Sequence, residues 1–110
     1  MAGSLRELLE EFKARTGADK VVLVSRTGMF IEGDDLDNQD TFSAMSAIVL
    51  GASETATSSI GPVDKIVVEI QKGYKLIITS AGKRGVLAVI SKKDHGEDIA
   101  LLKDKLKDVI

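Results

Sequence analysis

The sequence predicts an α/β (α+β) three-layer sandwich, in which a five-stranded antiparallel sheet is covered by helices on both faces. The first observation is the order of the predicted elements, α-β-β-α-β-β-β-α along 110 residues. The second is the short, glycine-containing connections between strands, because only antiparallel neighbours can be joined by tight turns. The third is that several strands carry apolar residues at successive positions, whereas a sheet wetted on one face should alternate.

The first helix has signals at both of its ends. Ser4 and Glu7 have the spacing of a capping box, in which a hydroxyl and a carboxylate each satisfy a free backbone N–H group. Gly17 supplies the C-terminal stop. Apolar residues recur between them at helical spacing: Leu5, Leu8, Leu9 and Phe12. Charged residues fill the other side, so we expect an amphipathic helix.

The next two strands form a predicted hairpin. The apolar run 21–24 and the run 29–31 are separated by a short segment that contains Gly28, and this spacing predicts a turn near that glycine. The acidic stretch 34–40 follows, and it leads into the second helix. We interpret it as a solvated loop that also places Asp40 at the positive end of that helix.

The second helix is predicted from about Thr41 to Ser59, where Gly61 and Pro62 break it. An apolar stripe is predicted to face the chain's own sheet, and it consists of Phe42, Met45, Val49, Ala52, Ala56 and Ile60. The opposite side should be charged if it met water. It carries small or uncharged residues instead: Ser43, Ala44, Ala47, Ile48, Gly51, Thr55 and Ser58. Glu54 is the only ionisable residue between Asp40 and Asp64.

We interpret this uncharged side as a helix-to-helix contact with a second copy of the chain. Ala47 and Gly51 would allow close approach, and a packing gain should offset the roughly 1 kcal/mol that a glycine costs in a helix interior. Two alternatives stay open: an exposed Ser/Ala-rich helix without consequence, or a close contact within the monomer. A membrane segment is excluded, because Ser and Thr are numerous and Glu54 lies inside it.

Three more strands are predicted at 65–71, 74–80 and 86–91, joined by turns at 72–73 and 81–85. If the first of them lies at a sheet edge, its free backbone groups invite pairing with another chain. The predicted dimer interface therefore comprises Ala44, Ala47, Ile48, Gly51, Glu54, Thr55, Ser58, Ile66, Val67, Val68 and Glu69. Asp94 with Glu97 is predicted to cap a last helix, whose buried side consists of Ile99, Leu102, Leu106 and Val109.

With these features the chain resembles the roadblock/dynein-light-chain family over nearly its whole length. The resemblance lies in the element order, the segment 21–29, the small-residue helix around 47–56 and the strand end 87–90. It implies one roadblock-like domain over residues 1–110 that dimerises through the second helix and third strand. It also implies a non-catalytic scaffold or adaptor that binds and regulates a small Ras-like GTPase. A heterodimer with another roadblock-type chain, a motor-complex light-chain adaptor and a small-molecule sensor are the alternatives.

Composition excludes several other classes. There is no cysteine, so neither a disulfide nor a thiolate metal site can form. The net charge of −2 and the pI near 5.4 give no electrostatic footprint for nucleic acid. The segment 1–4 lacks the basic and apolar parts of a signal peptide, and no charge-free apolar run reaches membrane-spanning length. We therefore expect a cytoplasmic protein without membrane insertion.

A search for chemistry predicts no catalytic residue, cofactor or metal. His95 is expected to be a solvated residue in the first turn of the last helix, with no second histidine for zinc. Asp35 and Asp37 have the spacing of a calcium loop, but Asp40 stands where such a loop needs glycine. The turn 82–85 is interpreted as a basic hairpin, with a ligand loop as the alternative. Lys83 and Arg84 of this turn are candidate contacts to an acidic partner, and Arg26 of the first hairpin is a further candidate partner contact.

Overall fold

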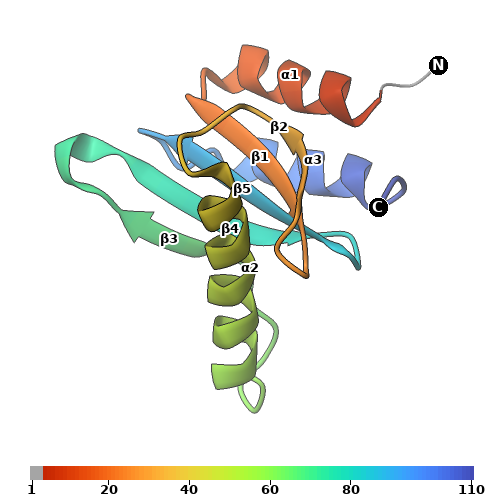
Figure 1. The fold of residues 1–110 in the computed structure, drawn as a ribbon, viewed down its shortest axis with the longest axis vertical. Coiled ribbons are helices and arrows are strands. Elements are labelled where there is room, and N and C mark those ends of the chain that lie inside the picture. Colours follow the sequence, from red (N-terminus) through yellow and green to blue (C-terminus); the bar gives the residue numbers. More distant parts are fainter. Residues whose placement is uncertain (1–3) are drawn as a thin grey trace.

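The computed structural model describes residues 4–110, so the start of the segment considered for a signal peptide, residues 1–3, lies outside the described residues. The elements follow the predicted order (Figure 1). They are α1 (Leu5–Thr16), β1 (Lys20–Ser25), β2 (Phe30–Gly33), α2 (Gln39–Ala56), β3 (Ile66–Glu69), the 3-10 turn η1 (Gln71–Gly73), β4 (Lys75–Ala81), β5 (Gly85–Ser91) and α3 (Gly96–Leu106).

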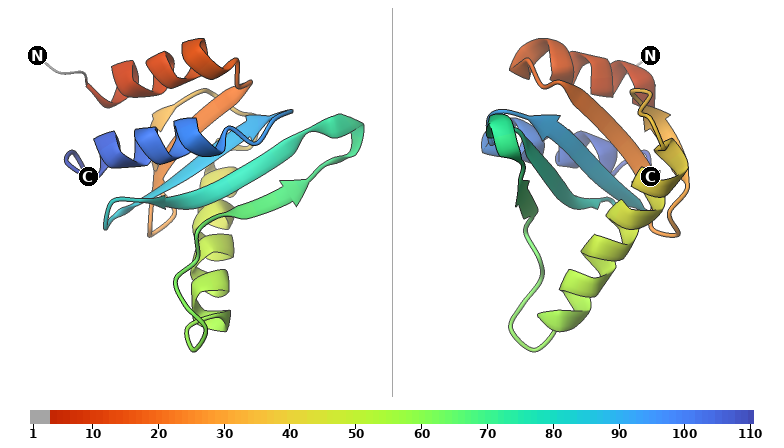
Figure 2. Two further views of the ribbon diagram at one scale, coloured as in Figure 1. Left: turned by 180° about the vertical axis from the view of Figure 1, so that it is seen from behind. Right: turned by 60° about the vertical axis from the view of Figure 1, so that its left-hand side comes forward.

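All five strands form one antiparallel sheet in the order β2-β1-β5-β4-β3. In the register at its centre, Leu23 lies opposite Leu87 and Ile77 lies opposite Val89. Helices α1 and α3 cover one face of the sheet, and α2 crosses the other (Figures 1 and 2). The three-layer architecture predicted from the sequence is thus confirmed.

Each face of the sheet has its own apolar core, and alternate residues of a strand enter different cores. Val21 and Leu23 of β1 belong to the core under α1 and α3. Val22 and Val24 of the same strand belong to the core under α2, together with Leu50. Because both sides of the strand are buried, its side chains must be apolar at successive positions. This is the physical reason for the unbroken apolar run at 21–24.

The helix ends are confirmed for α1 and corrected for α3. The Ser4 hydroxyl accepts from the Glu7 amide at 3.2 Å, the Glu7 carboxylate accepts from the Ser4 amide at 3.0 Å, and Gly17 ends the helix with φ 74°. The predicted cap of α3 by Asp94 and Glu97 is wrong, because α3 begins only at Gly96. Asp94 lies before it and accepts a hydrogen bond from Lys75 Nζ at 3.1 Å.

Other boundaries shift by a few residues. The third strand ends at Glu69 rather than 71, because the chain turns through η1, where Lys72 has φ 73°. In α3, Ile99, Leu102 and Leu106 are buried as predicted, whereas Val109 lies beyond the helix and is exposed. Among the helices of residues 4–110, none combines the length and apolar character needed to cross a membrane.

Candidate interaction surface

The face that α2 turns toward the sheet is centred on Ser43, Ser46 and Leu50, which are all buried. The predicted inward stripe is therefore only partly right. Phe42 and Val49 do pack against the core, but the others in that stripe are exposed: Met45, Ala52, Ala56 and Ile60. Serine is small enough for a helix to lie close to a sheet, so the helix buries these two serines beside Leu50, while Met45 points outward.

The outer face of α2, defined here by Met45, Ile48, Ala52 and Thr55, has no charged residue. Its two large side chains are exposed, Met45 to 49% and Ile48 to 56%. Ala47, predicted to face outward, is half-buried and packs against the chain's own core. A helix face that is uncharged and carries exposed large apolar side chains is typical of a contact surface.

Gly51 lies beside this outer face, and its surroundings test whether the glycine itself makes a close contact within the monomer. A Cβ atom added at Gly51 would meet no atom within 4 Å in the described part of the chain. The glycine is therefore not needed for close packing within the monomer. The alternative of a close contact within the monomer does hold for Ser43, which is buried, and for Ala47, which packs against the chain's own core. The missing side chain of Gly51 leaves room for a neighbour that approaches α2 from outside.

Strand β3 lies at an edge of the sheet and, within the described chain, pairs with β4 alone. Ile66 packs against the core under α2. Val67 and Val68 are exposed despite being β-branched and apolar, and Glu69 is exposed at the strand end. An edge strand of this kind offers both unpaired backbone groups and apolar side chains to another chain.

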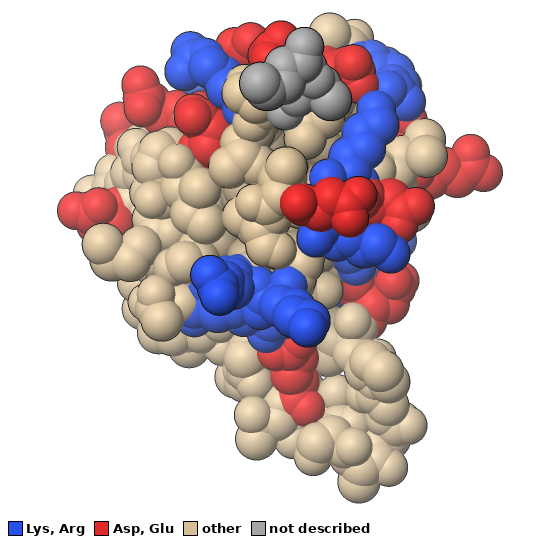
Figure 3. Space-filling model, turned by 90° about the vertical axis from the view of Figure 1, so that its right-hand side faces the viewer, with Lys and Arg blue, Asp and Glu red and all other residues tan. Residues whose placement is uncertain are grey.

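The C-terminal end of α2 and the segment 57–65 extend beyond the sheet as a lobe (Figures 1 and 2). On the face that Figure 3 shows, this lobe is almost free of charged side chains, with one acidic group above it. Thr55 and Ser58 are exposed here, and Ile60 is the most exposed large apolar side chain among the described residues. The lobe thus continues the uncharged outer face of α2 toward β3.

Basic side chains lie next to this uncharged surface (Figure 3). The turns after β1 and after β4 meet where the Arg26 amide donates to the Arg84 carbonyl at 2.8 Å, so Arg26, Lys83 and Arg84 form one basic tip. Arg26 pairs with Glu54 of α2. Lys83 and Arg84 form no ion pair within residues 4–110. The structure therefore brings together three candidate contacts that are up to 58 positions apart in sequence.

The comparison with protein families identifies this arrangement. A model described as the Roadblock/LC7 domain matches residues 5–91, which covers β1 to β5 and the α2 surface. The chain belongs to the Roadblock/LC7 domain family. Among curated proteins, no sequence is similar enough to count as a match.

Solved Roadblock/LC7 structures share this fold at low sequence identity. A Roadblock/LC7 domain from Streptomyces avermitilis is 23% identical with a TM-score of 0.84, over 97% of this chain and 98% of that one. MglB from Myxococcus xanthus is 20% identical with a TM-score of 0.84, over 96% and 93% of the two chains. A structure described as MglB with tetrameric arrangement is 18% identical with a TM-score of 0.75, over 99% and 89%.

His95 differs from its prediction as a solvated first-turn residue of α3. It precedes the helix with φ 51° and is half-buried. Its Nε2 atom lies 2.7 Å from the Ser91 hydroxyl, and its ring meets Phe12 edge-on at 6.3 Å between centroids. Within residues 4–110, no group of three or more His, Cys, Asp or Glu residues is placed to hold a metal ion. His95 in this Roadblock/LC7 domain therefore joins α3 to β5 and α1.

Asp34, the first carboxylate of the acidic stretch, turns inward rather than into solvent. It accepts hydrogen bonds from Lys13 Nζ at 2.7 Å and from the Val21 amide at 2.8 Å. Partial burial by itself would raise the pKa of Asp34, but these two hydrogen bonds and the charge of Lys13 hold it below its ordinary value. The acidic stretch thus begins with a carboxylate that ties α1 to β1, a role that its sequence pattern did not indicate.

Proposed function

We propose that this chain is a homodimeric scaffold that binds and regulates a small Ras-like GTPase in the cytoplasm, acting as a single domain without catalysis of its own. The observation that carries the proposal is the uncharged outer face of α2 beside the free edge of β3. These are the two elements through which the family resemblance implies dimerisation. In a monomer, the outer face of α2 and the unpaired edge of β3 would both stay exposed to water, which is unfavourable in free energy for their apolar side chains.

A two-fold axis beside β3 would serve both elements at once. It would pair β3 with its copy, extend the two sheets into one, and bring the two α2 helices side by side. The room beside Gly51 would then accept the neighbouring helix. The tetrameric arrangement described for a related MglB supports self-association of this fold. Pairing with another roadblock-type chain would use the same surface.

For the GTPase we assign the basic tip as a contact. Lys83 and Arg84 are exposed and without ion-pair partners within residues 4–110, so they can meet acidic groups of a partner at little desolvation cost. Arg26, already paired with Glu54, would hold the tip against α2. The chain then contributes a shaped surface, and the chemistry of nucleotide hydrolysis stays with the GTPase.

The dimer is tested with two matched variants. Ile48→Glu places a charge on the outer face of α2, whereas Leu101→Glu places the same charge on α3 at a site that is 49% exposed. We expect light scattering to give a wild-type mass near 23 kDa, twice the 11.7 kDa of one chain. Ile48→Glu and Gly51→Arg should give monomers, because a buried charge or an overpacked contact opposes association.

Leu101→Glu is the control that shows whether loss of the dimer in Ile48→Glu is specific to the outer face of α2. It should stay dimeric, because its surface is turned to solvent in the proposal. A monomeric wild type, or equal dissociation in both glutamate variants, would contradict the proposed interface.

The partner is tested separately by capture from native lysate with GDP or a non-hydrolysable GTP analogue. Nucleotide-dependent recovery of a Ras-like GTPase that Lys83→Glu abolishes, and Lys93→Glu does not, is the expected result.

A further inference from the structure

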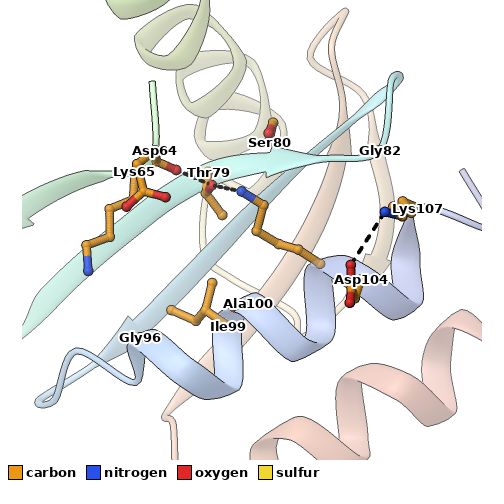
Figure 4. A pocket seen from close by; sticks show the side chains of 11 residues that line it. Asp64, Lys65, Thr79, Ser80, Gly82, Gly96, Ile99, Ala100, Asp104 and Lys107 are labelled. Atoms are coloured by element: carbon orange, nitrogen blue, oxygen red, sulfur yellow. Dashed lines mark hydrogen bonds and ion pairs between the residues drawn. The ribbon is translucent and has the colours of Figure 1, made fainter. Parts of the chain in front are cut away.

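A second concave surface lies on the opposite face of the sheet, far from the outer face of α2. It is a groove of about 430 Å³ between α3 on one side and β4 with the two residues before β3 on the other (Figure 4). It exists because α1 and α3 pack over the middle of the sheet and leave β3 uncovered. Val67, which faces this side in register with buried Ile77, is 39% exposed for that reason.

The chemistry of this α3 groove centres on Lys103. Its ammonium donates to the Thr79 hydroxyl at 2.9 Å, and that hydroxyl in turn donates to the Asp64 carbonyl at 2.6 Å. Thr79 is 1% exposed, so this chain of hydrogen bonds fixes the lysine head at the floor of the groove. Lys103 is half-buried, and no carboxylate within residues 4–110 lies at ion-pair distance from it.

A partly buried ammonium without a counter-charge is a site that favours an anion. Burial of a charge is unfavourable unless it is paired, and a lysine head has three N–H donors, of which Thr79 uses one. Lys65 and Lys107 also line the groove, against Asp64 and Asp104. Asp104 is occupied by Lys107 at 3.6 Å. One positive charge is therefore left in excess, and Lys103 carries it at the floor.

The shape of the groove indicates a chain segment rather than a small molecule. It follows the whole of α3 and reaches Lys107 just after it, a length of about 16 Å at the rise of an α-helix. An extended peptide covers that length in about five residues. Small-molecule sites bury most of their ligand's surface, whereas this groove is open along its side and would leave much of a small ligand in water.

We propose that the α3 groove binds an extended acidic segment of a protein partner, with one carboxylate of that segment accepting hydrogen bonds from Lys103. The groove is built entirely within one chain. The site therefore does not depend on the proposed dimer or on the basic tip, and each can fail without the other.

The test uses a fluorescein-labelled peptide of alternating glutamate and valine, five residues long, and the same peptide with glutamine for glutamate. We expect fluorescence anisotropy to show saturable binding of the acidic peptide at low salt. The glutamine peptide and the Lys103→Gln protein should each bind about ten-fold more weakly or worse, because a charge-assisted hydrogen bond is lost. Lys93→Gln removes the same charge at an exposed site outside the groove, and it should change binding less than about two-fold.

Amide chemical shifts locate the peptide and complete the test. Perturbations should centre on Thr79 and on α3, and unperturbed circular dichroism of Lys103→Gln should exclude misfolding as the cause of weaker binding. No binding, equal binding by Lys103→Gln, or shifts centred on Lys83 and Arg84 would overturn the proposal. If inorganic phosphate or glutarate binds as tightly as the peptide and shifts the same amides, the site is a small-anion site and the peptide proposal is wrong.

Discussion

The two faces of the sheet have similar apolar cores, but the helices that cover them differ in the charge of their outer surfaces. Each has an apolar core, one centred on Leu23 and Leu87 and the other on Leu50 and Val86. The helices over the first core carry charged outer surfaces. Glu11 of α1, for example, pairs with Arg15 at 3.2 Å and with Lys105 of α3 at 2.9 Å. Hydrogen bonding and attraction from Lys105, together with Arg15, hold the pKa of Glu11 below its ordinary value.

The helix over the second core lacks such a surface. Glu54 is the only ionisable residue between Asp40 and Asp64, and it pairs with Arg26. Charges are inexpensive on a helix face that stays in water and costly on one that will be covered. This difference in charge between α2 and the other two helices is the reason why we propose that α2 contacts another chain.

The largest expected effects come from truncating the two cores. Leu50→Ala and Leu106→Ala remove side chains that are buried to the same degree on opposite faces, and each should lower the free energy of unfolding by about 3 kcal/mol. Urea unfolding checks this. Only Leu50→Ala should also weaken the dimer in light scattering, because it loosens α2 on the sheet. Equal weakening by Leu106→Ala would remove the distinction between the faces.

A smaller effect is expected where α1 is tied to β1. Asp34→Asn removes the charge that Lys13 binds, and it should cost about 1.5 kcal/mol at neutral pH. Because the pKa of Asp34 is lowered in the folded state, its contribution is complete above the ordinary value of 3.8 and is lost as the pH falls below that value. The stability difference between wild type and variant should therefore narrow on acidification to pH 3. A difference that stays constant with pH would show that the carboxylate charge contributes nothing.

The smallest expected effect is an increase in the free energy of unfolding rather than a decrease. Ser43 of α2 is fully buried, and its hydroxyl has no hydrogen-bond partner among the described residues. Ser43→Ala should raise the free energy of unfolding by about 1 kcal/mol, since an unsatisfied buried hydroxyl is removed. Ser91→Ala is the matched control on β5, where the hydroxyl bonds to His95, and it should be destabilising by a similar amount. Destabilisation by both variants would indicate that Ser43 has a partner after all.

Much of this architecture could be predicted because local signals and the fold agree. The capping box at Ser4, the stop at Gly17 and the turn at Gly28 require only neighbouring residues, and the structure confirms all three. The rotation of α2 about its axis could not be predicted, since small serines and apolar residues occur on every side of that helix. Packing against the sheet determines which side of α2 faces inward, and as a result Ser43 is buried and Met45 is exposed.

The interaction surfaces show the same division. The sequence by itself determined the order of the elements, the presence of two buried sheet faces and the scarcity of charge along α2, because these depend on periodicity and composition. Only the tertiary structure decided which strand lies at the edge, which side chains of α2 face outward, and that Lys103 meets Thr79 at the floor of a groove. Those features arise from packing between segments far apart in sequence, and no local pattern encodes them.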